Sequence, residues 1–297
     1  MRAKLTFVGL LVLAGLLVFS GPAYAGGCIT NPGAAGDDGH TDHIPTKIYR
    51  NFLVVAEGQI GGAPECLNFV LDTGTSPSVI NLKLLAQLGL RATHSSTLAL
   101  GTRAFALAST IPELELGPIR ATSLPVMVKD LSRLESDFGI SIAGIIGMDV
   151  LSKSNFRLDY DTGEIEFGDI SHEGVPVQFD ERAGIAVANV TIAGRPVRML
   201  VDTGSEFVVL LGGNFGDAPW LTLRNSAQSG ASVADQKVRL QKFSAPDISL
   251  GGKHFSKGTA YFVPGSADPV FDGLLGIRAL GFRSLSYDRA CGTIYLQ

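Results

Sequence analysis

Short runs of apolar residues, separated by Gly, Pro, Asn or charged residues, recur along the chain from about residue 47 onward. The runs are rich in β-branched and aromatic residues, and turn-forming residues bound them, which is typical of strands. The pattern therefore predicts strands at residues 52–60, 67–72, 124–128, 157–161, 164–168, 186–194 and 293–297.

Residues 81–90 follow a different pattern, because their leucines recur near helical spacing and Gly89 stands where a helix would stop. We predict a helix there. A second short helical turn is expected after each of two similar segments, Ile145-Ile146-Gly147 and Leu274-Leu275-Gly276.

The order of these segments repeats once along the chain. With Asp72 aligned to Asp202, Gly144 in the first half and Gly273 in the second stand at nearly equal distances downstream. Residues 151–167 then match residues 280–296, a segment of the same length. The repeat predicts two small, mainly β lobes, residues 47–170 and 171–297, related by a pseudo-twofold axis, with the joint at residues 168–184.

The residues before the first lobe have the composition of an export signal and a leader. Residues 1–25 carry a basic start, an apolar core and a small-x-small cleavage site at Ala23-Tyr24-Ala25, so we expect them to be removed. Cleavage would remove Arg2 and Lys4 but no acidic residue, so the formal net charge of −4 would become more negative. Residues 26–46 are rich in Gly, Asp and Pro and predict a disordered leader, with its role as a pro-segment left open.

Charge and cysteine content argue against several classes of partner and site. A mildly acidic chain is a poor nucleic-acid binder, and no membrane partner is expected after signal cleavage. A lipid anchor at Cys28 is the less favoured alternative, because Ala25-Gly26-Gly27 lacks the large aliphatic residue usual before such sites. Three cysteines, Cys28, Cys66 and Cys291, allow one disulfide of unassigned pairing, and the absence of a C-x-x-C pair argues against structural zinc.

The chemistry of the repeat centres on two carboxylates set between apolar runs, Asp72 in VLDTGTSPSVI and Asp202 in LVDTGSEFVV. Burying an ionised carboxylate is costly, so two of them in matched positions need a reason. Two carboxyl groups held face to face share one proton, so that one can activate a water while the other acts as an acid. The neighbouring residues suit such a site through close backbone approach and hydroxyl donors: Thr73, Gly74, Thr75, Thr203, Gly204 and Ser205.

The double Asp-Thr-Gly-[Ser/Thr], each followed at a matched distance by Ile-Ile-Gly or Leu-Leu-Gly, resembles the aspartic proteases of the pepsin and retropepsin superfamily. The match covers residues 47–297 and is closest to two retropepsin-like lobes in tandem, as in exported bacterial members. The resemblance implies two closed β-barrel lobes with a few short helices and a cleft between them. It also implies a catalytic dyad of Asp72 and Asp202, loops interlocked by Thr73 and Thr203, Gly74 and Gly204 against the dyad, and no cofactor or metal.

The chain departs from the pepsin pattern in its flap. Residues 75–130 contain no Tyr, and the flap of the first lobe falls near residues 97–109, with Gly101 at its tip and Phe105 as its aromatic residue. Other catalytic patterns are absent: there is no G-x-S-x-G, and His172-Glu173 is not followed by the second His of a zinc protease motif. A metal site at His40, Asp42 and His43 is less favoured than a solvated tail.

The function expected from these features is that of an exported, periplasmic or secreted, aspartic endopeptidase acting on an extended peptide or protein as a monomer. The alternative is a catalytically inactive peptide-binding or regulatory module that retains the fold. A third arrangement, in which lobes of different chains pair, is disfavoured because the partner lobe within one chain has a high effective concentration.

Overall fold

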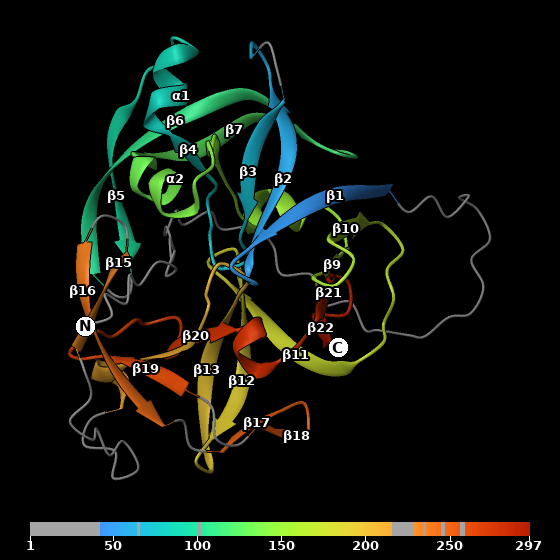
Figure 1. Cartoon of the computed structure of the whole chain (residues 1–297), viewed down its shortest axis with the longest axis vertical. Helices are drawn as coiled ribbons and strands as arrows, with labels where there is room; N and C mark the ends of the chain where they lie inside the picture. Colours follow the sequence, from blue (N-terminus) through green and yellow to red (C-terminus); the bar gives the residue numbers. More distant parts are fainter. Residues whose placement is uncertain are drawn as a thin grey trace.

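The computed structural model describes residues 42–63, 66–99, 102–215, 228–233, 236–244, 247–255 and 259–297. The chain is mainly β and forms two lobes, one above the other in Figure 1, joined by a group of strands on the right of the view. This confirms the two-lobe acid-protease architecture. The predicted signal, Cys28, His40 and the leader up to residue 41 lie outside the described residues.

The first lobe contains seven strands and three helices among its described residues: β2 (Leu53–Ile60), β3 (Leu67–Leu71), β4 (Val79–Asn81), β5 (Thr93–Ala99), β6 (Thr102–Leu116), β7 (Ile119–Lys129), β8 (Gly144–Ile146), α1 (Leu82–Gln87), α2 (Ser132–Phe138) and α3 (Met148–Leu151). The helix α1 begins after Asn81, whose side chain caps it by accepting from the backbone N–H of Lys83. Gly89 follows its end with a positive φ of 66°. The helix and the short turn α3 confirm the predictions made for this lobe.

The second lobe repeats this order with shorter helical turns: β12 (Ile185–Ile192), β13 (Arg195–Asp202), β14 (Val208–Leu211), η1 (Gly212–Asn214), β15 (Gln228–Val233), β16 (Gln236–Ser244), β17 (Ile248–Leu250), β18 (Lys253–Phe255), β19 (Thr259–Val263), β20 (Gly273–Gly276) and η2 (Ile277–Leu280). In the first lobe, the short strand β8 lies between β3, to which it is parallel, and β4, to which it is antiparallel. In the second lobe, β20 lies in the same way between β13 and β14.

Six antiparallel strands, here called the interlobe sheet, join the lobes: β1 (Asp42–Tyr49), β10 (Glu164–Phe167), β9 (Phe156–Asp159), β21 (Ser284–Asp288), β22 (Thr293–Leu296) and β11 (Val175–Arg182), in that spatial order. The pseudo-twofold axis passes between β9 and β21. There Phe156 is paired with Tyr287 and their rings stack 5.2 Å apart. The largest cluster of buried apolar side chains continues from one lobe through this sheet into the other.

One expectation about the ends of the lobes needs correction, and a second gains a structural detail. The expected disordered leader, residues 26–46, is wrong for residues 42–46, which form the first part of β1 and pair with β10 and β2. The expected joint, residues 168–184, contains strand β11, which pairs with β22 and then with β12. Both strands begin at an edge of the interlobe sheet, where solvent-facing polar residues hide the strand pattern.

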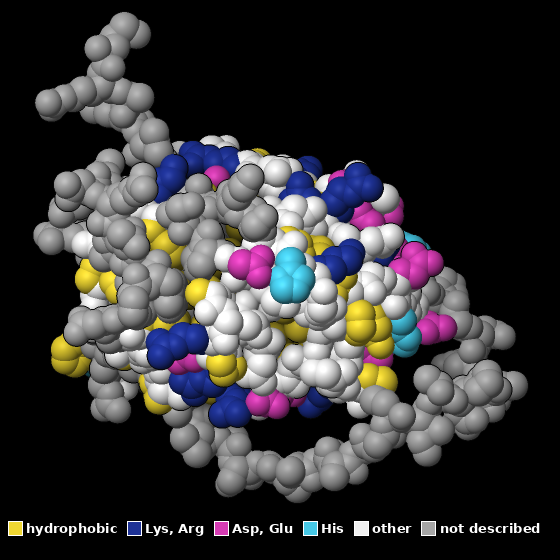
Figure 2. Space-filling model, turned by 90° about the horizontal axis from the view of Figure 1, so that it is seen from below, with side chains coloured by type: hydrophobic (Ala, Val, Ile, Leu, Met, Phe, Trp, Pro, Cys, Tyr) yellow, Lys and Arg dark blue, Asp and Glu magenta, His cyan; other side chains and the backbone are white. Residues whose placement is uncertain are grey.

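The surface carries charges of both signs. Figure 2 shows acidic and basic side chains interspersed over the described part of the face seen from below. Among the helices of the described residues, none has the length and apolar content to cross a membrane.

Candidate active site

The two Asp-Thr-Gly loops meet between the lobes, where β3 and β13 end. Asp72 follows β3, Asp202 ends β13, and both side chains are 0% exposed. The loops are tied to each other by reciprocal hydrogen bonds, from the backbone N–H of Thr73 to Thr203 Oγ1 and from that of Thr203 to Thr73 Oγ1, each 3.0 Å long. The two threonine hydroxyls also donate across the axis, to the carbonyls of Val201 (2.8 Å) and Leu71 (3.3 Å). Each lobe therefore fixes the position of the other lobe's acid.

The glycines of the motif bring each carboxylate against the opposite loop. Gly74 donates its N–H to Asp72 Oδ1 and Gly204 donates its N–H to Asp202 Oδ1, both at 2.8 Å. A Cβ on Gly74 would lie 2.6 Å from Cγ of Asp202, and one on Gly204 would lie 2.7 Å from Cγ of Asp72. Such distances are too short for any side chain, so the approach of the two carboxyl groups requires glycine at both positions.

Burial and mutual proximity set the protonation of the pair. Burial, the largest effect, raises the pKa of both carboxyls, because it disfavours the charged form. The negative charge of Asp72 and a hydrogen bond to it raise the pKa of Asp202 further, well above its ordinary range. Hydrogen bonds from Thr75 and Gly74 oppose the rise in the pKa of Asp72. The pair therefore holds one proton at pH values between the pKa of Asp72 and the higher pKa of Asp202.

The residues that follow the two glycines differ between the lobes. Thr75 Oγ1 donates to Asp72 Oδ2 at 2.7 Å. Ser205 Oγ instead donates to the carbonyl of Phe207 at 2.9 Å, and Asp202 Oδ2 has no donor among the described residues although it is fully buried. The sequence predicted a hydroxyl donor beside each acid, and the structure places one beside Asp72 alone.

The downstream Gly-containing segments lie directly beside the loops. Strand β8 runs parallel to β3 and its Ile146 carbonyl accepts from the N–H of Asp72 at 3.0 Å. Strand β20 pairs with β13 so that Gly276 lies opposite Asp202. Asp149, just after β8, accepts hydrogen bonds from the N–H and hydroxyl of Ser78, and this fixes the end of the first loop. The number of residues between each Asp and its downstream Gly-containing segment is nearly equal in the two halves. This equal spacing reflects the equivalent positions of β8 beside Asp72 and β20 beside Asp202.

Two residues near the site were not identified from the sequence. Tyr160 follows β9 with a buried hydroxyl that has no hydrogen-bond partner among the described residues. Its pKa is raised first by burial and also by the charges of Asp202 and Asp72, which places the hydroxyl near the pair. Arg278 lies over its ring, 5.0 Å from the centroid, and donates to the Asn51 carbonyl and side chain in the first lobe. No sequence motif marks Tyr160 or Arg278. When the two halves of the chain are aligned, Arg278 is equivalent to Asp149, so the internal repeat does not single it out.

Each lobe also carries a long hairpin, β5–β6 in the first and β15–β16 in the second, both on the left of Figure 1. The expected flap, residues 97–109, falls on the first of these. Its expected tip, Gly101, lies outside the described residues, and the side chain of Phe105 is 100% exposed. Single exposed hydrophobic side chains are common on protein surfaces, so the exposure of Phe105 alone does not identify a ligand contact.

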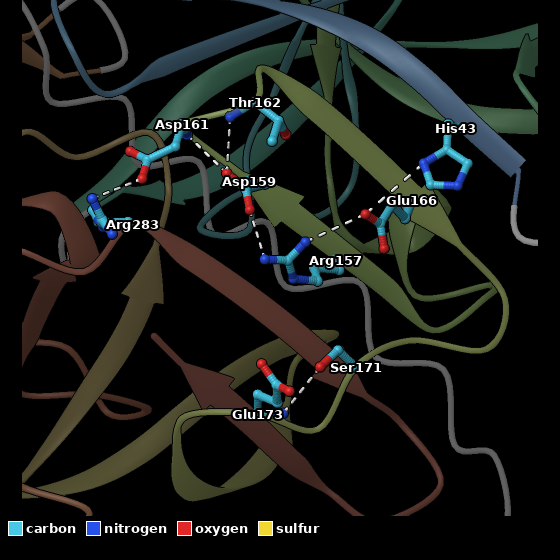
Figure 3. Close-up of polar contacts among 9 residues, drawn as sticks. All are labelled: His43, Arg157, Asp159, Asp161, Thr162, Glu166, Ser171, Glu173 and Arg283. Atoms are coloured by element: carbon cyan, nitrogen blue, oxygen red, sulfur yellow. Dashed lines mark hydrogen bonds and ion pairs between the residues drawn. The ribbon is translucent and has the colours of Figure 1, made fainter.

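A cluster of charged residues on the interlobe sheet is the group of described residues that could hold a metal ion. The potential ligand atoms of His43, Glu164 and Glu166 lie within 4.8 Å of one another. As Figure 3 shows, however, Arg157 lies between Glu166 and Asp159 and donates to both, at 3.3 and 2.6 Å. The guanidinium already compensates the charge of Glu166, and Glu166 Oε1 also lies 3.9 Å from His43 Nδ1. These side chains therefore form a polar network that joins β1, β10 and β9.

The described cysteines give no disulfide between Cys66 and Cys291. Any bond of either residue to Cys28 involves a residue outside the described part of the chain.

Comparison with known proteins agrees with this geometry. A family model described as aspartyl protease matches residues 56–150 and 188–279, one segment in each lobe, and together these cover more than half of the chain. No curated protein sequence matches the chain. Two matched segments, each containing one buried Asp-Thr-Gly loop, show that this chain belongs to the aspartyl protease family in a single-chain, two-lobe, retropepsin-like form.

Proposed function

We propose that the protein is an exported aspartic endopeptidase that hydrolyses peptide bonds with a water activated between Asp72 and Asp202. The observation that carries the proposal is the pair of fully buried carboxyls, each hydrogen-bonded by its own glycine and packed against the glycine of the other loop. A binding module has no need to bury two opposed acids, because their charge is costly away from water.

The reaction follows from one proton shared by two acids. The ionised carboxylate takes a proton from water as the water oxygen bonds to the peptide carbonyl carbon, and the protonated carboxyl gives its proton to the carbonyl oxygen. The tetrahedral diol then collapses: the C–N bond breaks, the amine nitrogen takes a proton from the first acid, and a diol hydroxyl returns a proton to the second. The products are a carboxylic acid and an amine, and the pair regains its starting state.

The proposed substrate is an extended segment of a peptide or protein. The hairpins β5–β6 and β15–β16 offer strand edges that can pair with an extended backbone, which gives affinity with little dependence on side chains. We further propose that residues 1–25 direct export to the periplasm or the medium. N-terminal sequencing of exported protein should then begin at residue 26.

The test uses Asp72→Asn and Asp202→Asn, each alone, with exposed Asp180→Asn as the matched control. We expect either dyad variant to lose at least about 10²–10⁴-fold in kcat/KM on a mixed peptide library, because each acid has a separate proton to transfer. The control should cleave as the wild type does. Undiminished cleavage by either dyad variant contradicts the proposal.

A binding measurement separates the enzyme from the inactive module. A statine-type peptide, whose hydroxyl imitates the tetrahedral diol, should raise the Tm of the wild type and raise it less in Asp72→Asn and Asp202→Asn. A wild type that binds ordinary peptides equally well, cleaves none and shows no preference for the statine-type peptide would instead be the inactive peptide-binding module.

A further inference from the structure

Arg278, in the second lobe, makes hydrogen bonds that reach into the first lobe. Its Nε donates to the backbone carbonyl of Asn51 at 3.0 Å, and its Nη2 donates to the side-chain oxygen of the same residue at 2.8 Å. The third nitrogen, Nη1, donates at 2.7 Å to the carbonyl of Phe282, just after η2. All three guanidinium nitrogens are therefore used, and two of them bind one residue of the other lobe.

The guanidinium of Arg278 also lies against an aromatic ring of the first lobe. Its central carbon is 5.0 Å from the centroid of Tyr160, a buried residue that follows β9. The backbone N–H of Tyr160 in turn donates to the carbonyl of Arg283, in the second lobe, at 2.8 Å. The cation–π contact is a second attraction between Arg278 and the first lobe, in addition to the hydrogen bonds to Asn51.

Each end of the Arg278–Asn51 contact lies close along the chain to a strand that flanks one of the acids. Arg278 comes just after β20, the strand that pairs with the end of β13 at Asp202. Asn51 comes just before β2, the strand that pairs with β3 at the residue preceding Asp72. The contact therefore joins the strand beside one acid to the strand beside the other.

The internal repeat does not account for this contact. When the two halves are aligned, Arg278 is equivalent to Asp149. Asp149 accepts hydrogen bonds from the N–H and the hydroxyl of Ser78, at 3.0 and 2.6 Å, and both residues belong to the first lobe. Asp149 thus supports the loop of its own lobe, whereas Arg278 reaches across the pseudo-twofold axis.

We propose that Arg278 is a positioning residue that holds the two strand ends in register across the axis and so keeps Asp72 and Asp202 at the separation that hydrolysis needs. The proposal rests on the proposed function for its catalytic meaning. The reciprocal threonine bonds join the loops themselves, and the Arg278–Asn51 contact joins the supporting strands. Two separate points of contact limit the rotation of one lobe against the other. Since small displacements of reacting groups are costly in rate, loss of the contact should lower kcat more than substrate affinity.

The experiment removes the contact from either side. Arg278→Met keeps an unbranched apolar side chain and removes the donors. Asn51→Gly removes the side-chain acceptor and keeps the backbone carbonyl, and glycine readily adopts the positive φ of 68° at this position. Arg283→Met is the matched control, because Arg283 also pairs across the lobes, with Asp161 at 3.0 Å (Figure 3). That pair lies on the interlobe sheet beside β9 and β21, which do not pair with β3 or β13.

Two readouts are combined: kcat and KM on a peptide, and hydrogen exchange of the Thr73 and Thr203 amides without substrate. These N–H groups donate across the axis, so their exchange reports opening of the loops. We expect Arg278→Met to lower kcat about tenfold, to change KM less than about twofold, and to speed both exchanges about tenfold. Asn51→Gly should give about threefold effects, because one of the two acceptors stays in place. Arg283→Met should change neither readout.

The combined variant, Arg278→Met with Asn51→Gly, tests whether the two residues act through the same contact. We expect its kcat and exchange rates to match those of Arg278→Met alone, because the side-chain hydrogen bond is already absent.

Three outcomes overturn the inference. The first is wild-type kcat and exchange in Arg278→Met with a lowered Tm, which indicates a purely stabilising role. The second is an equal loss in Arg283→Met, and the third is a combined variant whose loss is the product of the two single losses. If Arg278→Met does not fold, unchanged kcat and exchange in Asn51→Gly overturn it instead. Failure of the proposed function is distinguishable, because a protein that cleaves no peptide still shows whether exchange at the loops depends on Arg278.

Discussion

The two buried carboxyls are the residues where stability and function oppose each other. Each sits at 0% exposure, where its charged form lacks water, and each is held there by a glycine that no other residue can replace. A raised pKa in the folded state means that the folded protein binds a proton more tightly than the unfolded chain does. The pair thus costs free energy of folding at pH values where an ordinary carboxyl is ionised.

This cost gives a prediction with a definite sign. In the window from about pH 4, the ordinary carboxyl pKa, up to the raised pKa of the pair, the folded state holds more protons than the unfolded state, so the pair's contribution to stability falls as pH rises. Asp202→Asn removes the effect. We therefore expect its free energy of unfolding to exceed that of the wild type at pH 7 and to approach it near pH 4, in urea titrations at several pH values.

Asp159 provides a control, because its pKa is lowered in the folded protein whereas that of Asp202 is raised. Burial would raise the pKa of this carboxyl, but hydrogen bonds from the N–H groups of Thr162 and Asp161 and the charge of Arg157 outweigh it and lower the pKa. Its stabilising contribution is present above about pH 4 and is lost as pH falls through the lowered pKa. Asp159→Asn should therefore destabilise at pH 7. A destabilised Asp202→Asn at pH 7 would contradict the account of the dyad.

At the scale of elements, the short strands β8 and β20 determine where the acids lie. Gly144 and Gly273 begin these strands with ordinary extended backbone, yet a Cβ at either would lie 2.4 and 2.3 Å from the carbonyl oxygens of Val79 and Val209. The glycines are therefore required by the closeness of the neighbouring strand. They are also the landmarks by which the internal repeat was recognised in the sequence.

We expect Gly273→Ala to lower the free energy of unfolding by about 1–3 kcal/mol, because β20 must move away from β14. Activity should fall as well, since β20 also pairs with the end of β13 at Asp202. Gly194→Ala is the control: nothing lies within 4 Å of its Cβ, and its positive φ of 77° costs about 1–2 kcal/mol without touching the site. Urea unfolding and kcat/KM of both variants check the prediction, and full activity of Gly273→Ala would contradict it.

Much of the element level was predictable, because strands, α1 and the repeat leave local patterns of apolar residues and turn-forming residues. The start of β1 was missed, since its pairing depends on β10, which is distant in the sequence, and its exposed residues are polar. The different orientation of the Ser205 hydroxyl was also beyond sequence reasoning, because it depends on where the backbone of Phe207 passes. Tyr160 reaches the site from the end of β9 and Arg278 reaches it from η2, and no spacing in the sequence encodes either position.

For the whole molecule, the interlobe sheet makes the site a property of one chain. Strands β9 and β21 pair across the pseudo-twofold axis, with Tyr287 stacked on Phe156 and Phe179, and Arg278 adds hydrogen bonds from the second lobe to Asn51 of the first. All of these contacts join residues of the same chain, and both acids of the dyad come from that chain.

We therefore expect the mature protein to elute as a single chain in gel filtration and to keep the same kcat per chain on dilution over about three orders of magnitude, because an intramolecular partner is always present at high effective concentration. A specific activity that falls with dilution, together with a dimer at high concentration, would instead indicate that lobes of different chains pair.

The covalent connection between the two lobes affects how the two sides of the active site can evolve. In a protease assembled from two identical subunits, one mutation alters both sides of the cleft at once. Here Thr75 and Ser205 are encoded by separate codons of one gene. A mutation can therefore change the loop of one lobe while the loop of the other lobe is preserved. The hydroxyls of Thr75 and Ser205 have different partners, a difference between the two sides that is compatible with separate change in each half of the gene.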